Sequence, residues 1–118
     1  MNGKKTWIIP DGYMNPTKNG DFNSHEAICV LNLSGKDAHI DIKIYFEDRE
    51  PLCGFKAECK NERTNHIRLD KIVSENGDKI PFGISYAVLV ESDTDIVVQH
   101  SRMDVSQAEM ALMSTIAY

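Results

Sequence analysis

Residues 38–46 read Ala-His-Ile-Asp-Ile-Lys-Ile-Tyr-Phe, and this stretch decides the fold class. Apolar residues at positions 40, 42, 44 and 46 alternate with more polar residues at positions 39, 41, 43 and 45. Because successive side chains of a strand point to opposite faces, this period of two predicts a strand with one buried and one solvated face. Such strands are typical of antiparallel sheets.

Shorter runs with the same pattern lie on both sides of this stretch. We predict further strands at residues 6–9, 27–33, 53–60, 64–69, 84–91 and 96–102, and in part of 110–117. Residues 34–37, Ser-Gly-Lys-Asp, have the composition of a hairpin turn between the strands at 27–33 and 38–46. Residues 92–95, Ser-Asp-Thr-Asp, resemble a polar turn between two valine-rich strands. About eight short strands at this spacing predict an all-β fold, an antiparallel β-sandwich or a jelly-roll-like barrel.

Helical structure is expected at most as a short turn. Residues 106–115 include strong helix formers, yet the apolar residues between 110 and 117 also alternate as in a strand. We expect a helical turn over residues 105–109 followed by a final strand, and the sequence leaves helix and strand both open for 106–117. A second short helical turn is expected at residues 69–73.

Bulk composition narrows the class of protein. The 118 residues suit one compact domain spanning residues 1–118. A formal net charge of -5 argues against a nucleic-acid partner, which needs a basic surface. No signal peptide is visible, and no apolar stretch approaches the roughly 20 residues that cross a bilayer, so we expect a soluble cytoplasmic protein. Three cysteines without a CxxC pair are interpreted as structural thiols.

Three polar groups stand beside predicted strands, at residues 24–26, 63–68 and 99–104. In the third group an apolar run passes directly into Gln, His, Ser, Arg, Met and Asp. Strand alternation places His100 and Arg102 on one face, with Gln99 and Ser101 on the other. A polar, titratable cluster at the edge of a core is typical of a binding or catalytic site.

Two kinds of chemistry are weakly supported by these groups. His25, His66 and His100, with Glu26 or Asp104, are metal-ligand types, but no motif supplies two ligands from one element, so no metal or cofactor is expected. Residues 24–26 have the residue types of a serine triad, but neighbours on an extended segment point to opposite faces, and no nucleophile elbow is present. We therefore expect no enzyme activity, and a metal-dependent or hydrolytic enzyme remains the weaker alternative.

Small-ligand binding is better supported, because forked polar groups beside aromatic rings recognise sugars and small polar acids. In this hypothesis Arg68 and Arg102 supply charge-assisted donors, and the histidines supply adjustable donors or acceptors. Trp7 fits the core of the first strand as well as a ligand site. The expected ligand-binding residues are Trp7, Ser24, His25, Glu26, Asn32, Arg63, His66, Arg68, Gln99, His100, Arg102 and Asp104.

The chain resembles the sensory rhodopsin transducer family nearly end to end. The blocks that carry the resemblance are Trp7 with Gly12–Tyr13, Ser24–His25–Glu26, and residues 29–32, 37–39, 45–46, 48–51, 63–68, 96–104, 107–109 and 114–118. The resemblance implies a β-sandwich or jelly-roll-like domain, a homotetramer and a cytoplasmic location.

The founding role of that family is signal relay from a membrane photoreceptor, a microbial rhodopsin. The wider family resembles a set of small-molecule-binding domains with sugars as proposed ligands. We therefore expect a non-enzymatic signalling or ligand-binding domain in which the three polar groups converge. The alternative is a pure interaction module whose polar cluster stabilises the tetramer.

Overall fold

The structure is a computed structural model that describes residues 2–19, 22–105 and 111–118. The strands are β1 (Lys4–Gly12), β2 (Lys18–Asn19), β3 (Phe22–Asn23), β4 (His25–Asn32), β5 (Ala38–Tyr45), β6 (Leu52–Cys59), β7 (Arg63–Arg68), β8 (Tyr86–Asp104) and β9 (Ala111–Ile116). No helix occurs among the described residues. The all-β prediction is therefore confirmed.

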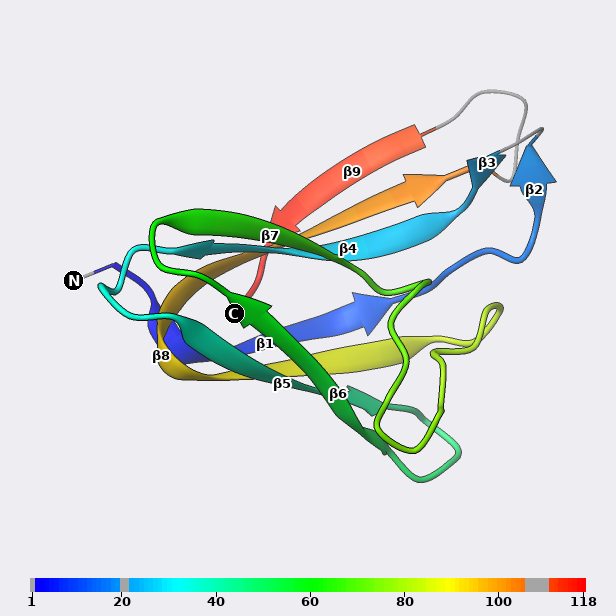
Figure 1. Cartoon of the computed structure of the whole chain (residues 1–118). Coiled ribbons are helices and arrows are strands. Elements are labelled where there is room, and N and C mark those ends of the chain that lie inside the picture. Colours follow the sequence, from blue (N-terminus) through cyan, green and yellow to red (C-terminus); the bar gives the residue numbers. More distant parts are fainter. Residues whose placement is uncertain (1, 20–21, 106–110) are drawn as a thin grey trace.

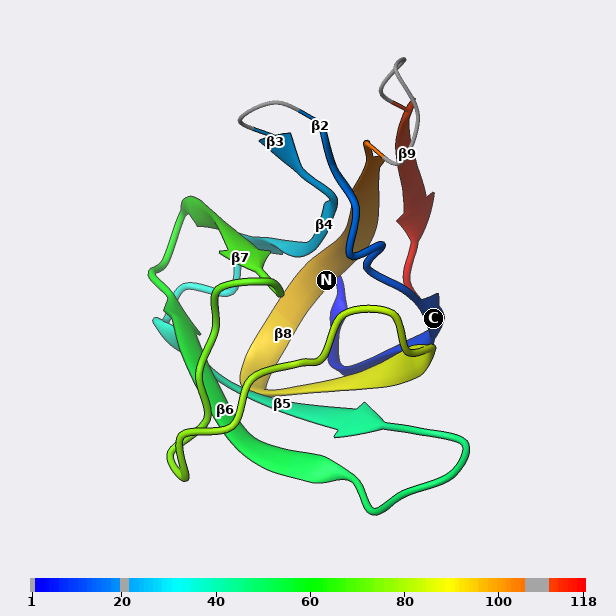
Figure 2. The same cartoon turned by 90° about the vertical axis from the view of Figure 1, so that its right-hand side faces the viewer.

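Seven of the strands form one curled antiparallel sheet that folds into two layers through β8 (Figure 1). The first half of β8 pairs with β5 and β1, and β6 lies beyond β5. The second half of β8 pairs with β4 and β9, and β7 lies beyond β4. Figure 2 shows β8 as one curved strand that passes from one layer to the other.

The predicted polar turn at residues 92–95 is wrong, because β8 is one continuous strand of 19 residues. Ser92 still pairs with Ile40 of β5, and Ile96 already pairs with Lys4 of β1. The polar run contains neither glycine nor proline, so it has no residue that forces the chain to reverse. Its residues are at least partly exposed at the bend between the layers, so solvent can hydrogen-bond their polar side chains without a turn.

The predicted hairpin at residues 34–37 is also wrong. β4 pairs with β7 and β8, whereas β5 pairs with β6 and β8, so the connection crosses from one layer to the other. Turn-forming residues favour a change of direction, but they do not decide whether the flanking strands then pair.

The remaining local predictions have mixed outcomes. Ile72 N donates to Arg68 O at 3.2 Å, so the expected helical turn near residue 69 is a single turn and not a helix. Residues 111–116 form β9, the predicted final strand. The helical turn expected at 105–109 falls mainly on residues 106–110, outside the described residues.

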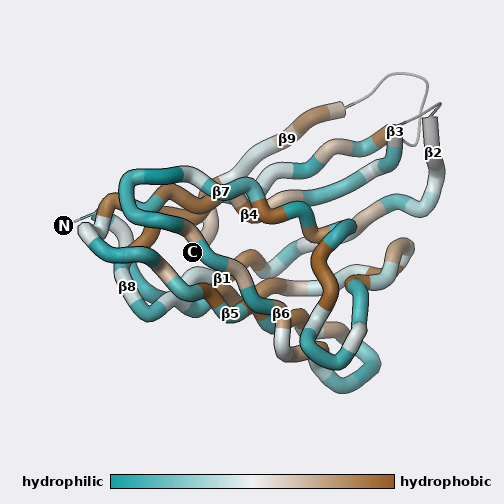
Figure 3. Tube along the Cα trace, viewed as in Figure 1, coloured by the Kyte–Doolittle hydropathy of each residue, from teal (hydrophilic) through white to brown (hydrophobic). Residues whose placement is uncertain are grey.

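The core lies between the two layers. Ile40, Ile42 and Ile44 are buried there, as the period of two predicted, and each contributes about 2 kcal/mol of hydrophobic free energy. Figure 3 shows hydrophobic and hydrophilic residues alternating along the strands. Trp7 belongs to this core, with Nε1 donating to the carbonyl oxygens of Lys4 and Ile96 at 2.9 and 3.0 Å.

The three cysteines are free thiols. Cys59 is buried, Cys53 is exposed, and Cys29 is half-buried on β4. The described residues contain no helix long and apolar enough to cross a membrane.

Candidate functional site

The centre of the candidate site is the carboxylate of Glu26, which is fully buried on β4. Oε2 accepts from Arg102 Nε at 2.6 Å and from the backbone N–H of Tyr13 at 2.8 Å. Oε1 accepts from His100 Nε2 at 3.1 Å and from the Tyr86 hydroxyl. Four donors therefore surround one buried carboxylate, which is how proteins make a buried charge tolerable.

Three separate segments deliver these donors. His100 and Arg102 share the inner face of β8, as strand alternation predicted, and they lie beside β4 because the two strands pair. Tyr86 comes from the other end of β8, in the opposite layer, so its hydrogen bond to Glu26 links the two layers. Tyr13 follows directly after β1.

The hydrogen bonds fix the charge state of the centre. Burial by itself raises the pKa of Glu26, but the bonds from His100, Tyr86 and the Tyr13 N–H outweigh it and lower that pKa below its ordinary value. Burial, followed by the negative charge of Glu26, raises the pKa of Tyr86. Glu26 is therefore an ionised acceptor, and Tyr86 remains a protonated donor.

A cleft of about 180 Å³ opens beside this centre, between β1, β8 and β9. Its lining consists of Ile9, Pro10, Asp11, His100, Arg102, Met113, Thr115, Ile116 and Tyr118. His100 is only 1% exposed, and its Nδ1 is the one buried side-chain nitrogen or oxygen without a partner among the described residues. The site thus combines a satisfied carboxylate, one unsatisfied nitrogen and an adjacent cleft.

A larger hollow of about 320 Å³ lies between the end of β1 and the end of β5. It shares Pro10 and Asp11 with the smaller cleft and is bordered by Tyr86. Because the Tyr86 hydroxyl is already bonded to Glu26, this hollow presents no buried polar atom that needs a partner. The smaller cleft is therefore the better candidate, despite its size.

The other residues of the first predicted polar group lie near Glu26 but have local roles. Ser24 Oγ accepts from Val105 N at 2.9 Å, which ties the start of β4 to the end of β8. His25 Nδ1 lies 3.1 Å from Asn23 O. Neither side chain lines the cleft.

The second predicted group, on β7, is not brought to the cleft. Arg68 makes a two-pronged ion pair with Asp70, with N–O distances of 2.8 and 2.9 Å. Arg63 and His66 are exposed, and Arg63 donates to Glu62 O. The structure therefore brings the first and third groups together and leaves the second apart.

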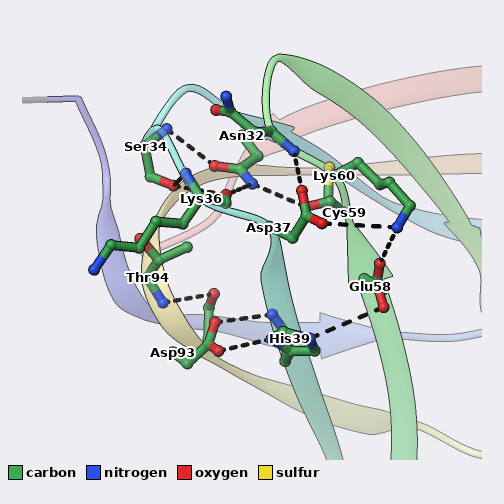
Figure 4. A network of polar contacts seen from close by, with 12 residues as sticks. Asn32, Ser34, Lys36, Asp37, His39, Glu58, Cys59, Lys60, Asp93 and Thr94 are labelled. Atoms are coloured by element: carbon green, nitrogen blue, oxygen red, sulfur yellow. Dashed lines mark hydrogen bonds and ion pairs between the residues drawn. The ribbon is translucent and has the colours of Figure 1, made fainter.

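Three further predicted residues occupy other places. Gln99 is exposed on β8, and Asp104 is the last residue of that strand, opposite Ala111. Asn32 is buried at the far end of β4, where its Nδ2 donates to Lys36 O and Cys59 O at 2.7 and 2.8 Å (Figure 4). This network joins the ends of β4 and β6 and is structural.

Sequence reasoning missed two parts of the site. Tyr86 alternates with the buried Val88 and Val90, so a hydroxyl on a buried strand face was a usable signal that this ring needed an acceptor. Asp11 lies at the mouth of the cleft, where its Oδ2 is 3.9 Å from Arg102 Nη2, and nothing in its sequence surroundings pointed there. No group of three or more histidine, cysteine or acidic residues within the described ranges could hold a metal ion.

A family model and one similar solved structure name the same family. The family model described as ASRT, Anabaena sensory rhodopsin transducer, matches residues 2–118. The crystal structure of Thermotoga maritima 1070 is similar at 37% identity with a TM-score of 0.89, covering 100% of this chain and 96% of that one. The Anabaena sensory rhodopsin transducer is similar at 37% identity with a TM-score of 0.77, covering 91% of this chain and 94% of that one. No curated protein matches the sequence.

Proposed function

Because this chain belongs to the Anabaena sensory rhodopsin transducer family, we propose that it is a non-enzymatic signalling domain that binds a small polar ligand in the cleft beside His100. The observation that carries the proposal is the unpaired Nδ1 of His100. Buried polar atoms almost always have a hydrogen-bond partner, and leaving one without a partner costs about 1–3 kcal/mol. A ligand in the cleft can supply the missing partner.

The surroundings of His100 favour binding over catalysis. Glu26 accepts four hydrogen bonds, and Tyr86 is held as a protonated donor by burial and by the charge of Glu26. Groups held in this way orient a binding site, but they are poorly suited to taking up and releasing protons during a reaction. The cleft also combines apolar walls with few polar groups, which is the usual composition of a ligand site.

A binding screen with one matched pair of variants tests this proposal. Small sugars, polyols, amides, amines and acids are titrated into the protein, and binding is followed by calorimetry and by NMR of the histidine side chains. We expect His100→Phe to abolish binding of any compound found, while His66→Gln, which changes an exposed histidine of β7, leaves it intact. Affinities that are equal in both variants contradict the assignment of the cleft.

We also propose that the protein works in the cytoplasm as a homotetramer and relays a signal from a membrane receptor. The similar Anabaena protein is by its name a transducer for a sensory rhodopsin, and a receptor of that class is the proposed partner here. An interaction function is supported by apolar side chains exposed on the layer that contains β9. These are Leu31, Val97, Leu112 and Ile116, with exposed fractions of 41%, 37%, 79% and 73%.

Exposed apolar side chains that gather on one sheet typically mark a contact surface. Arg102 and His100 instead bond to Glu26 within the chain, so we assign assembly to the β9 layer and not to the polar cluster. Light scattering tests this choice. Ile116→Lys is expected to lower the measured mass, whereas Val73→Lys, at an exposed apolar residue between β7 and β8, leaves it unchanged. An unchanged mass in Ile116→Lys would remove β9 from the interface.

A further inference from the structure

We infer that the ligand of the His100 cleft donates an N–H or O–H hydrogen bond to His100 Nδ1 and carries no negative charge. This inference rests on the proposed ligand-binding function and names the chemical class that the same site accepts. It is drawn from three features of the cleft: the proton position on His100, the engagement of Arg102 and the charges around the opening.

The proton on His100 is placed by its neighbour. Nε2 lies 3.1 Å from Oε1 of Glu26, and an ionised carboxylate only accepts hydrogen bonds. In the neutral form of the ring the proton therefore sits on Nε2, and Nδ1 presents a lone pair. The two ring nitrogens point in diverging directions, so Nδ1 faces away from Glu26 while the ring forms part of the cleft wall.

Arg102, which the sequence suggested as a charged donor to a ligand, is already paired within the chain. Its Nε is bonded to Glu26 at 2.6 Å, and its Nη2 lies 3.4 Å from Asp11 O and 3.9 Å from Asp11 Oδ2. One cation thus already stands between two carboxylates of the chain, Glu26 and Asp11. An anionic ligand would have to displace one of these contacts and meet the other carboxylate.

The size and the apolar walls of the cleft further restrict the class of ligand. A volume of about 180 Å³ admits only a small molecule. Ile9 and Met113 provide apolar walls around the polar groups. The ligand therefore combines a short apolar part with one hydrogen-bond donor, as in a small alcohol, primary amide or protonated amine.

Five probes of nearly equal size separate these requirements: 1-butanol, butyramide, n-butylamine, butyrate and methyl propyl ether. Binding is measured by NMR titration, following His100 and the residues that line the cleft. We expect the alcohol, the amide and the amine to bind at least about tenfold more tightly than butyrate or the ether, because the ether lacks the donor and butyrate adds a negative charge. Equal affinity for the ether overturns the donor requirement.

The charge argument has its own variant and control. Asp11→Asn removes the carboxylate at the mouth of the cleft and is expected to strengthen butyrate binding by more than it changes 1-butanol binding. Asp78→Asn, at a partly exposed aspartate between β7 and β8 that does not line the cleft, is the matched control and is expected to change neither affinity. If butyrate already binds wild-type protein as tightly as 1-butanol does, the exclusion of anions is wrong.

Direct observation of the ring gives a second readout. Long-range nitrogen–proton correlation spectra are expected to show His100 protonated on Nε2 and unprotonated on Nδ1 in the free protein. A proton on Nδ1 overturns the inference. Butyrate or ether binding at His100 as tightly as butanol defeats the inference but leaves the proposed function standing. If no compound of the panel or of the wider screen perturbs the cleft, both fail.

Discussion

Arg102 Nε lies 2.6 Å from Glu26 Oε2, and the two residues stand directly opposite each other in the register of β4 and β8. The Glu26 side chain is fully buried, while the Arg102 side chain is 21% exposed. The pair closes the polar network at its solvent side, and the remaining donors to Glu26 approach from within the protein.

Replacing Glu26 with glutamine should destabilise the fold. Removing one partner of a buried ion pair leaves the other charge and its donors uncompensated, and the neutral amide can serve only some of them. We expect Glu26→Gln to lower the free energy of unfolding by about 3 kcal/mol in urea titrations. The control is Glu58→Gln on the exposed face of β6, which should lose far less. Equal losses of unfolding free energy in the two variants would show that the Glu26 network contributes no more to stability than an exposed glutamate does.

The same carboxylate should make stability fall in acid. Its pKa is lower in the folded protein than its ordinary value of 4.5, so the unfolded chain binds more protons between the two values. The contribution is fully present above the ordinary value and is lost as pH falls through the folded value. Between about pH 5 and pH 2, the urea midpoint of the wild type should fall more steeply than that of Glu26→Gln. Parallel curves would contradict the lowered pKa.

His39 should titrate above its ordinary range because of Asp93. The hydrogen bond that His39 Nδ1 donates to Asp93 Oδ2 at 2.8 Å, followed by the charge of Asp93, raises the pKa of His39 above 6.5, with a smaller effect from Glu58 (Figure 4). Stability from this contact is therefore fully present below 6.5 and lost as pH rises through the folded value. In NMR titrations, Asp93→Asn should lower the pKa of His39 more than Glu58→Gln does. The reverse order would rule out the assigned contact.

Two glycines with similar backbone angles should respond differently to alanine. Gly3 and Gly35 have φ of 89° and 92°, a backbone conformation that residues with a side chain rarely adopt. A Cβ at Gly3 would clash with the carbonyl oxygen of Ile96, whereas one at Gly35 would meet nothing within 4 Å. We expect Gly35→Ala to cost about 1 kcal/mol and Gly3→Ala about 3 kcal/mol, measured by urea denaturation. Similar costs would show that backbone strain outweighs the clash.

Much of the fold could be predicted from local patterns, because the alternation of apolar and polar residues along a strand identifies both the strand and its buried face. The alternation at residues 38–46 gave β5 and its buried face, and the run at residues 96–104 gave the inward pair His100 and Arg102. Residues 92–95 were predicted as a turn because polar runs often form turns. β8 continues there because β5 pairs with it as far as Ser92 and β1 pairs with it again at Ile96, on either side of an irregularity in the β1 register, and this pairing is a property of the whole sheet.

The candidate site was less predictable, because its parts come from distant segments. Glu26 was named with Ser24 and His25, its neighbours in sequence, but its partners Tyr86, His100 and Arg102 lie 60 to 76 residues away. β7 was expected to contribute Arg68, which instead pairs with Asp70. Residue types and their spacing do not indicate which strands pair with each other in the sheet.

The sequence alone determined the all-β class, the face on which most side chains lie, and the family to which the chain is similar, because each depends on order along the chain. Tertiary structure decided that β8 passes through both layers, that Tyr86 reaches Glu26 across them, and that one nitrogen of His100 stays unpaired beside a cleft. The physical reason is that hydrogen-bond satisfaction in a core depends on all strands at once. The period-two alternation of a strand is enough to place His100 on the inner face. Only the packing of the two layers leaves its Nδ1 without a partner.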